Sequence, residues 1–134
     1  MIRGIRGATT VFHNQEDLVI DAADELLRKM IEANEVEAAD VASVFISVTS
    51  DINAAFPSKA LRRFPDWKFV PIMCMQEIPV INSLPFCIRV MLHVNTNKPQ
   101  DEINHIYLNN AVVLRPDLAV TREDNEDEME KSNS

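Results

Sequence analysis

The chain has 134 residues, of which 46% are apolar, and a formal net charge of −8. This length fits a single domain, and the apolar share is large enough to form a core. The acidic balance argues against nucleic acid as a partner, because phosphate binding needs clustered Lys and Arg side chains. No segment reaches the roughly 18 uninterrupted apolar residues of a membrane span, so no membrane partner is expected either.

Much of the negative charge lies at the end of the chain. Residues 122–134 carry six acidic side chains and two basic ones. A segment with so little apolar surface cannot offset the entropy lost on ordering. We therefore expect one domain over residues 1–118 and an acidic, disordered tail over residues 119–134.

The first part of the chain predicts a strand, a helix and a second strand. Residues 1–11 end in a β-branched run, and Gly4 and Gly7 indicate that other atoms approach this backbone closely. After Asn14, a candidate helix cap, apolar residues recur at helical spacing for roughly 18–20 residues. This pattern predicts an amphipathic helix with one face on a sheet. Residues 41–48 predict the next strand.

The second part predicts short elements. Pro57 starts a short helical turn, since proline suits the first position of a helix. Residues 68–75 and 86–95 predict a third and a fourth strand. Residues 99–105 predict another short helix, and residues 111–114 a last short strand.

This order of elements predicts an α+β fold, in which a mixed β-sheet is covered on one face by one long helix and accompanied by short helical turns. A single helix would leave the other face of the sheet bare. Because a sheet this rich in apolar residues should bury that face against copies of itself, we expect an oligomer.

A charged residue stands inside the apolar strand of residues 87–94, which read CIRVMLHV. Period two places Arg89 on the less apolar face of this strand. Since an arginine keeps its proton, a buried one must be paired or must face a charged ligand. Glu77 is the obvious partner in sequence. The residues leave two possibilities open, an ion pair that locks an interface and an anion site that both side chains share.

Other cations accompany Arg89. Arg6 lies between the two glycines, and Arg115 lies at the end of the expected domain. Lys59, Arg62 and Arg63 lie on the predicted turn. Each could be an ordinary surface charge, but together they suit the recognition of a small molecule that carries carboxylates.

Catalytic and metal-binding patterns are poor in this chain. Cys74 and Cys87 lie in apolar surroundings, where we expect reduced thiols of a cytosolic protein in preference to a disulfide. Cys74 lacks the helix N-terminus and the orienting partner of a nucleophile. The three histidines show no metal-ligand spacing, and two glycines are too few for a phosphate-binding loop. The sequence therefore predicts an anion-binding domain that uses no metal and no cofactor.

Six segments resemble the AroH-class monofunctional chorismate mutases, in order along the chain. They read MIRGIRGATTV, DINAAFPSKALR, VPIMCMQE, CIRVMLHVNT, KPQDEINHIYL and AVVLRPDL, and together they span residues 1–118. The resemblance implies a cytoplasmic homotrimer with a barrel-like core of three sheets and active sites between subunits. It also implies the conversion of chorismate to prephenate, on the route to phenylalanine and tyrosine. This rearrangement moves no proton, so the enzyme needs only to hold the compact substrate and stabilise separating charge.

The resemblance assigns roles to single residues. Arg89 corresponds to the arginine that reaches the ether oxygen of the substrate. Glu77 corresponds to the acceptor of the ring hydroxyl, with Cys74 near the same hydroxyl. Arg6 and Tyr107 correspond to the pair that binds the side-chain carboxylate. The other implied site residues are the wall residue Phe56, the lining residues Met73 and Leu114, the neighbouring subunit's cations Lys59 and Arg62, and the entrance residue Arg115.

Some positions depart from this pattern. Ser58 stands where alanine is common, and Met73 where a smaller polar residue is frequent, changes that bear on affinity more than on the reaction. Either Arg62 or Arg63 faces the cleft. Two other functions stay open, a non-catalytic trimeric regulatory module that keeps the carboxylate pocket, and a hydrolase or transferase that depends on Cys74.

Overall fold

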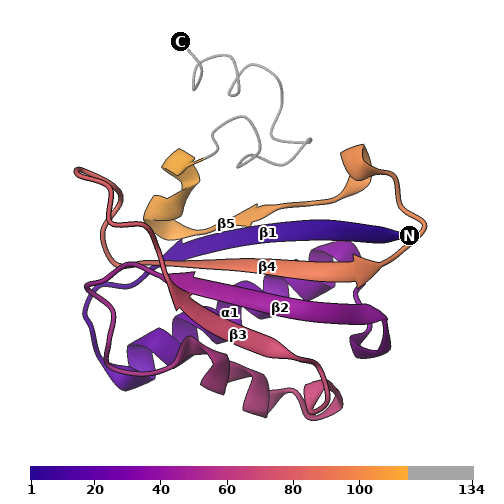
Figure 1. Ribbon diagram of the computed structural model, residues 1–134, viewed down its shortest axis with the longest axis horizontal. Coiled ribbons are helices and arrows are strands. Elements are labelled where there is room, and N and C mark those ends of the chain that lie inside the picture. The colour runs from indigo at the N-terminus through magenta and orange to yellow at the C-terminus, as the bar shows by residue number, and fades with distance from the viewer. Residues whose placement is uncertain (115–134) are drawn as a thin grey trace.

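The structure, a computed structural model, describes residues 1–114 and consists of one five-stranded sheet with one long helix (Figure 1). Arg115 and the predicted acidic tail lie outside the described residues. The helix and strands are β1 (Ile2–Thr10), α1 (Glu16–Asn34), β2 (Val41–Val48), β3 (Ile72–Gln76), β4 (Cys87–Asn95) and β5 (Ile106–Tyr107), joined by short 3-10 helices at Ala38–Asp40, Pro57–Arg63, Pro65–Trp67, Gln100–Glu102 and Asn109–Leu114.

The sheet is mixed, as predicted, with the strand order β3-β2-β4-β1-β5. Strand β4 runs antiparallel to both of its neighbours, β1 and β2. The two edge strands pair in parallel, β3 with β2 and β5 with β1. The predicted α+β class is therefore confirmed.

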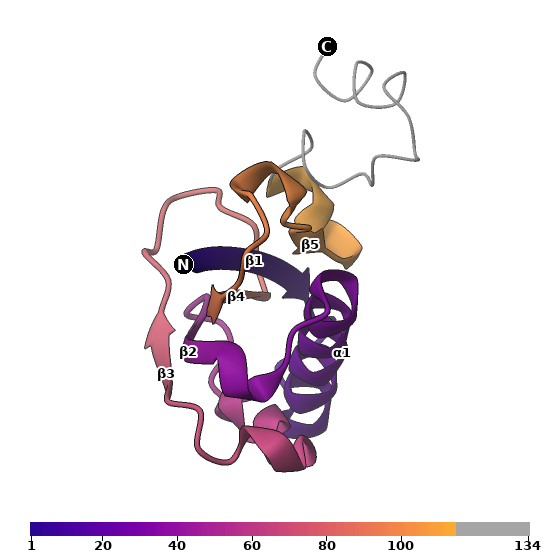
Figure 2. The same cartoon turned by 90° about the vertical axis from the view of Figure 1, so that its right-hand side faces the viewer.

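Helix α1 covers one face of this sheet (Figure 2). Its apolar stripe is fully buried and includes Val19, Leu26 and Met30, which pack in the same core as Ile46 and Leu92 of the sheet. Burying such a stripe contributes about 1.5–3 kcal/mol for each large side chain, which explains why the helix lies flat on the strands.

The predicted helix cap is wrong. Gln15 occupies the N-cap position and makes no side-chain cap hydrogen bond. The carbonyl oxygen of the Asn14 side chain instead accepts from the backbone N–H groups of Asn53 and Ala54, at 3.0 and 2.9 Å. Asn14 therefore stabilises the loop after β2, a contact between distant segments that local spacing does not reveal.

Gly7 confirms the expected close approach to β1. A Cβ atom at this position would overlap Sδ of Met30 and lie 3.0 Å from Cδ1 of Leu26, both on α1. Because Met30 and Leu26 are fully buried, neither has space to retreat. The glycine therefore lets α1 pack directly on the backbone of β1.

We expect Gly7→Ala to lower the free energy of unfolding by about 1–3 kcal/mol, through overpacking against Met30. Urea denaturation at one fixed protein concentration measures this change. Gly4→Ala is the matched control, since its Cβ would lie 3.2 Å from the end of the flexible Met91 side chain. Equal destabilisation by the two substitutions would contradict the packing explanation.

Residues 111–114 were predicted as a strand, and this prediction is wrong, because Asn109–Leu114 form a 3-10 helix. Asn109 has a left-handed backbone with φ of 55°, and its side-chain amide donates to Thr9 Oγ1 at 3.0 Å. The backbone N–H of Asn110 donates to Thr10 Oγ1 at 3.3 Å. These bonds to the end of β1 outweigh the strand propensity of the segment.

Two other predicted boundaries change, and one strand was not predicted. The third strand begins at Ile72, since residues 68–71 still belong to the connection after the 3-10 helix Pro65–Trp67. The predicted helix of residues 99–105 shrinks to one turn at Gln100–Glu102. Strand β5 follows it and was missed, because two residues are too few to show a period.

No helix among residues 1–114 covers the face of the sheet that lies opposite α1. Three large apolar side chains on this face are exposed to 39%, 61% and 42%: Phe45, Met73 and Met75. The bare face expected from a single helix is therefore confirmed. Within the described part of the chain, no helix is both long enough and apolar enough to cross a membrane.

Candidate functional site

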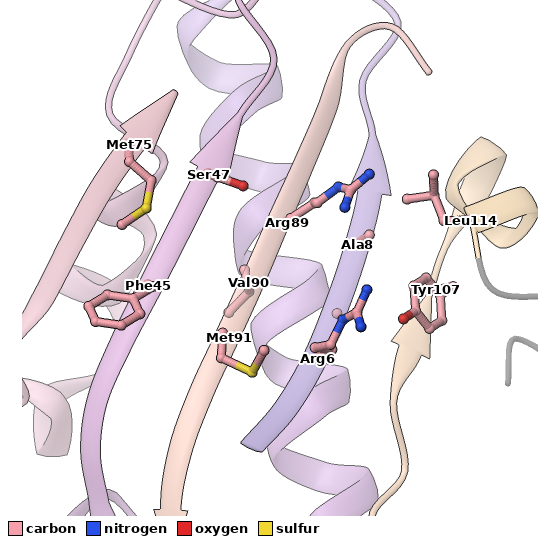
Figure 3. A pocket seen from close by; sticks show the side chains of 11 residues that line it. Arg6, Ala8, Phe45, Ser47, Met75, Arg89, Val90, Met91, Tyr107 and Leu114 are labelled. Carbon is pink, nitrogen blue, oxygen red and sulfur yellow. The ribbon is translucent and has the colours of Figure 1, made fainter. Parts of the chain in front are cut away.

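A pocket of about 260 Å³ lies on the bare face of the sheet, over β1, β4 and β2 (Figure 3). Its charged and polar side chains come from strands that are far apart in sequence. Those that carry the argument are Arg6, Ser47, Arg89 and Tyr107, and the apolar wall includes Met75 and Leu114.

Strand register brings the two arginines together. Arg89 of β4 pairs with Ala8 of β1, and Arg6 pairs with Met91. Arg6 and Arg89 are therefore diagonal neighbours on one face of adjacent strands, a separation that long side chains can span. Ala8 between them leaves the space into which both guanidinium groups extend (Figure 3).

Glu77 lies beside Arg89, as its sequence position indicated. The Nε atom of Arg89 is 3.5 Å from Oε2 of Glu77. Two bonds hold the glutamate in place. Its backbone N–H donates to the Val48 carbonyl at 2.8 Å and so prolongs the pairing of β2 with β3. The Ser47 hydroxyl donates to Glu77 Oε2 at 2.7 Å.

Two buried donors in this pocket have no hydrogen-bond partner. Among the described residues, Arg89 Nε and Tyr107 Oη are the buried side-chain nitrogen and oxygen atoms that lack one. The contact of Arg89 with Glu77 has the length of an ion pair but not the geometry of a hydrogen bond. An unsatisfied buried polar group costs about 1–3 kcal/mol, so both atoms call for a ligand with acceptor oxygens.

The other predicted cations form a second group. Phe56, Lys59 and Arg62 line a cavity of about 650 Å³ beside the 3-10 helix Pro57–Arg63. Side chains three residues apart share one face of a 3-10 helix, which explains why these three point the same way. Ser58 also lines this cavity.

Arg63 does not line that cavity. Its guanidinium contacts Asp24 and Asp21 of α1 at 2.8 and 2.9 Å. Hydrogen bonds to these carboxylates, first Asp24 and then Asp21, raise the pKa of Arg63 above its ordinary value. Arg62 is therefore the arginine that faces the cavity.

The remaining predicted residues lie on β3 or beyond the described chain. Met73 pairs with Phe45 and shares the pocket face of the sheet, although it does not line the 260 Å³ pocket. Cys74 points to the opposite face, where it packs against the main core beside Ile72, a residue of the second cavity. Arg115 is not described.

Sequence reasoning missed Ser47. Period two places it on the same face as Phe45, but a serine within an apolar strand has many ordinary explanations. Its role follows from register, since Ser47 pairs with Arg89 across β2 and β4 and thus lies within reach of Glu77.

The cysteine thiols are free, and one is well protected. Cys87 is buried, and burial raises the pKa of its thiol, an effect that the positive charge of Arg89 only partly offsets. Less thiolate is therefore present at pH 8 than in an ordinary cysteine. Within residues 1–114, no group of three His, Cys, Asp or Glu side chains could hold a metal ion.

We expect Cys87 to stay unmodified by iodoacetamide in the native protein at pH 8 and to react fully in guanidinium chloride. Mass spectrometry of the two cysteine peptides measures both rates, with half-buried Cys74 as the internal comparison. Native labelling of Cys87 as fast as in denaturant would show that the thiol is neither buried nor raised in pKa.

The chain resembles proteins of one kind over most of its length. The family model described as chorismate mutase type I matches residues 2–118. Chorismate mutase AroH of Bacillus subtilis (strain 168) is 49% identical over 122 residues, which cover 91% of this chain and 96% of that protein. Chorismate mutase AroH of Thermus thermophilus is 45% identical over 119 residues, covering 88% and 97%. The solved structure of a chorismate mutase from Clostridium thermocellum has a TM-score of 0.81 at 47% identity, covering 83% of this chain and 98% of that one.

Proposed function

We propose, from the premise that this chain belongs to the type I chorismate mutase family, that its pocket converts chorismate to prephenate. The family makes the chain an intramolecular isomerase of aromatic amino acid biosynthesis. The observation that carries the assignment of this pocket is the pair of buried, unpartnered donors, Arg89 Nε and Tyr107 Oη, beside a second cation, Arg6.

The reaction is a Claisen rearrangement, in which one C–O bond breaks while one C–C bond forms. Electrons shift within a ring of six atoms, no proton leaves the substrate, and no covalent bond to the enzyme forms. Catalysis then requires only that the substrate be held in its compact shape and that charge on the departing ether oxygen be stabilised. A pocket of fixed cations and hydrogen-bond donors supplies both.

In the proposed complex, Arg89 donates to the ether oxygen, where negative charge grows as the C–O bond lengthens. Arg6 and Tyr107 bind the side-chain carboxylate, and Glu77 accepts from the ring hydroxyl. Ser47 keeps the glutamate oriented, because its bond to Oε2 leaves Oε1 available to the substrate. The buried position of Tyr107 favours a strong bond, since the group competes with little water.

We further propose a homotrimer with each active site between two subunits. Two features support it. The sheet face that carries Phe45, Met73 and Met75 is bare, and the site residues of one chain form two separate groups. A neighbouring subunit would then supply Phe56, Lys59 and Arg62 to the pocket of Arg89. In the same arrangement Met73 approaches the site from β3, Leu114 lines it and Arg115 covers its entrance. Cys74 points to the opposite face of the sheet, so it would reach a site only together with the Phe56, Lys59 and Arg62 group of its own chain.

A cytoplasmic location belongs to the same proposal, because both cysteines are free thiols, as is usual in a reducing compartment. No cofactor is part of it, since the rearrangement consumes no electrons and moves no group between molecules.

The direct test is the loss of chorismate absorbance on addition of purified protein in a buffer with EDTA, with prephenate identified by NMR. We expect turnover far above the slow spontaneous reaction. Tight binding of chorismate without turnover would overturn the enzyme assignment in favour of a regulatory module. Loss of all activity after Cys74→Ser, with a covalent adduct on the unmodified protein, would favour a thiol mechanism.

A further inference from the structure

The 3-10 helix Pro57–Arg63 carries the cations of the second cavity, yet little within it determines where they point. Hydrogen bonds of a 3-10 helix have poorer geometry than those of an α-helix, so short ones depend on their surroundings. Phe56, at the N-cap, makes no side-chain cap bond. Pro57 and Ala60 are buried and face inward, which leaves the end of the helix to be held by other contacts.

Arg63 makes those contacts at the end of the helix, and near its start Lys59 Nζ lies 3.5 Å from Oε2 of Glu16 on α1. The Nη1 atom of Arg63 donates to Asp24 Oδ2 at 2.8 Å, and its Nη2 lies 2.9 Å from Asp21 Oδ1. Asp21 and Asp24 are three residues apart and therefore adjacent on one face of α1. One planar guanidinium thus bridges two carboxylates of the long helix, an arrangement that restricts rotation as well as distance.

Asp24 is held in a fixed position. Its side chain is only 11% exposed, and it is also bonded to Arg28. The guanidinium of Arg28 stacks over the ring of Phe64, 4.3 Å from its centroid, directly after the 3-10 helix. A nearly buried carboxylate must remain paired. Because Arg28 stays with Asp24 when Arg63 is replaced, the fold should survive that replacement.

We propose that Arg63 is a positioning residue, which touches no ligand and holds the 3-10 helix so that Lys59 and Arg62 face the second cavity. This inference rests on the proposed function, in which a neighbouring subunit supplies those two cations to the pocket of Arg89. There they would bind a carboxylate of the substrate. A carboxylate keeps its charge throughout the rearrangement. The cations therefore bind substrate and transition state alike, and their misalignment should raise KM while kcat changes little.

Arg63→Gln should raise KM for chorismate about three- to fivefold and leave kcat within about twofold, as expected for partly exposed ion pairs that act on uniform binding. Arg63→Lys, which keeps the charge but loses the two-pronged geometry, should give an intermediate KM. The matched control is Arg3→Gln, because Arg3 makes its two hydrogen bonds to Lys98 and Gln100, away from this helix. An unchanged KM for Arg63→Gln, or an equal rise for the control, overturns the inference.

The sharper test is made in the background Lys59→Gln/Arg62→Gln. If Arg63 acts through these two cations, adding Arg63→Gln there leaves kcat/KM unchanged, whereas a general structural role would lower kcat/KM again by the same factor. Circular dichroism and thermal unfolding confirm that each variant is folded. Should Arg63→Gln not fold, Asp21→Asn removes one prong of the bridge and must raise KM by a smaller factor, and no rise overturns the inference. Failure of the unmodified protein to convert chorismate refutes the proposed function, whereas normal turnover with a normal KM in Arg63→Gln refutes only the role of Arg63.

Discussion

Replacing Arg89 by methionine is expected to lower kcat for chorismate by at least about 10²–10³-fold, the usual effect of losing a fixed donor to a developing negative charge. The methionine fills similar space and removes the guanidinium. Glu77 keeps its bond to Ser47, so the pocket should retain its shape. Loss of chorismate absorbance at saturating substrate measures kcat directly.

Arg89→Lys is the informative control. It keeps a positive charge at this position of β4 but cannot reproduce the directed Nε and Nη donors of a guanidinium. We expect activity between that of methionine and arginine. Near-normal turnover of Arg89→Met would remove charge stabilisation by this residue from the mechanism.

Two variants with little activity at low chorismate concentration are expected to restore activity to each other if the sites lie between subunits. One carries Arg89→Met, and the other carries Lys59→Glu together with Arg62→Glu. In a closed ring, each site would take its Arg89 half from one chain and its Lys59 and Arg62 half from the next. An equal mixture then contains intact sites at about a quarter of all positions, because each of two halves is intact with a chance of one half.

The experiment unfolds both variants together, refolds the mixture, and compares its activity with that of each variant refolded alone. Light scattering should report three chains per particle. A mixture no more active than its components, from particles of the expected mass, would show that each pocket draws on one chain only.

The fold was largely predictable from local patterns. Helix α1 has a clear helical period, and strands β1, β2 and β4 form close to the predicted boundaries. The short elements were harder to predict, since the apolar residues 111–114 look like a strand by themselves. Their helical form depends on bonds from Asn109 and Asn110 to the end of β1, about a hundred residues away in the chain.

The site was predictable in its residue types and not in its assembly. An arginine within an apolar strand indicated an anion site, and Glu77 was identified as its neighbour. The family resemblance, and not the pattern, pointed to Arg6 and Tyr107. Neither indicated Ser47, because a change of register by one residue would carry that hydroxyl to the opposite face of the sheet.

The choice between Arg62 and Arg63 shows the same limit at short range. In a 3-10 helix, the side chains of adjacent residues point a third of a turn apart, so only one of these two arginines can face the cavity. The sequence of this short segment does not show whether it forms a 3-10 helix or an α-helix. The choice depends on the position of α1, because its residues Asp21 and Asp24 bind Arg63.

The two unpartnered donors also lower the free energy of unfolding of the ligand-free protein. Each donor costs about 1–3 kcal/mol of stability relative to an apolar or hydrogen-bonded side chain at the same position. Substrate returns that energy on binding, and so protects the occupied chain from unfolding more than the empty one. Resistance to heat and to proteases should thus increase with the concentration of chorismate. In variants selected only for stability, we expect the hydroxyl of Tyr107 to be lost first.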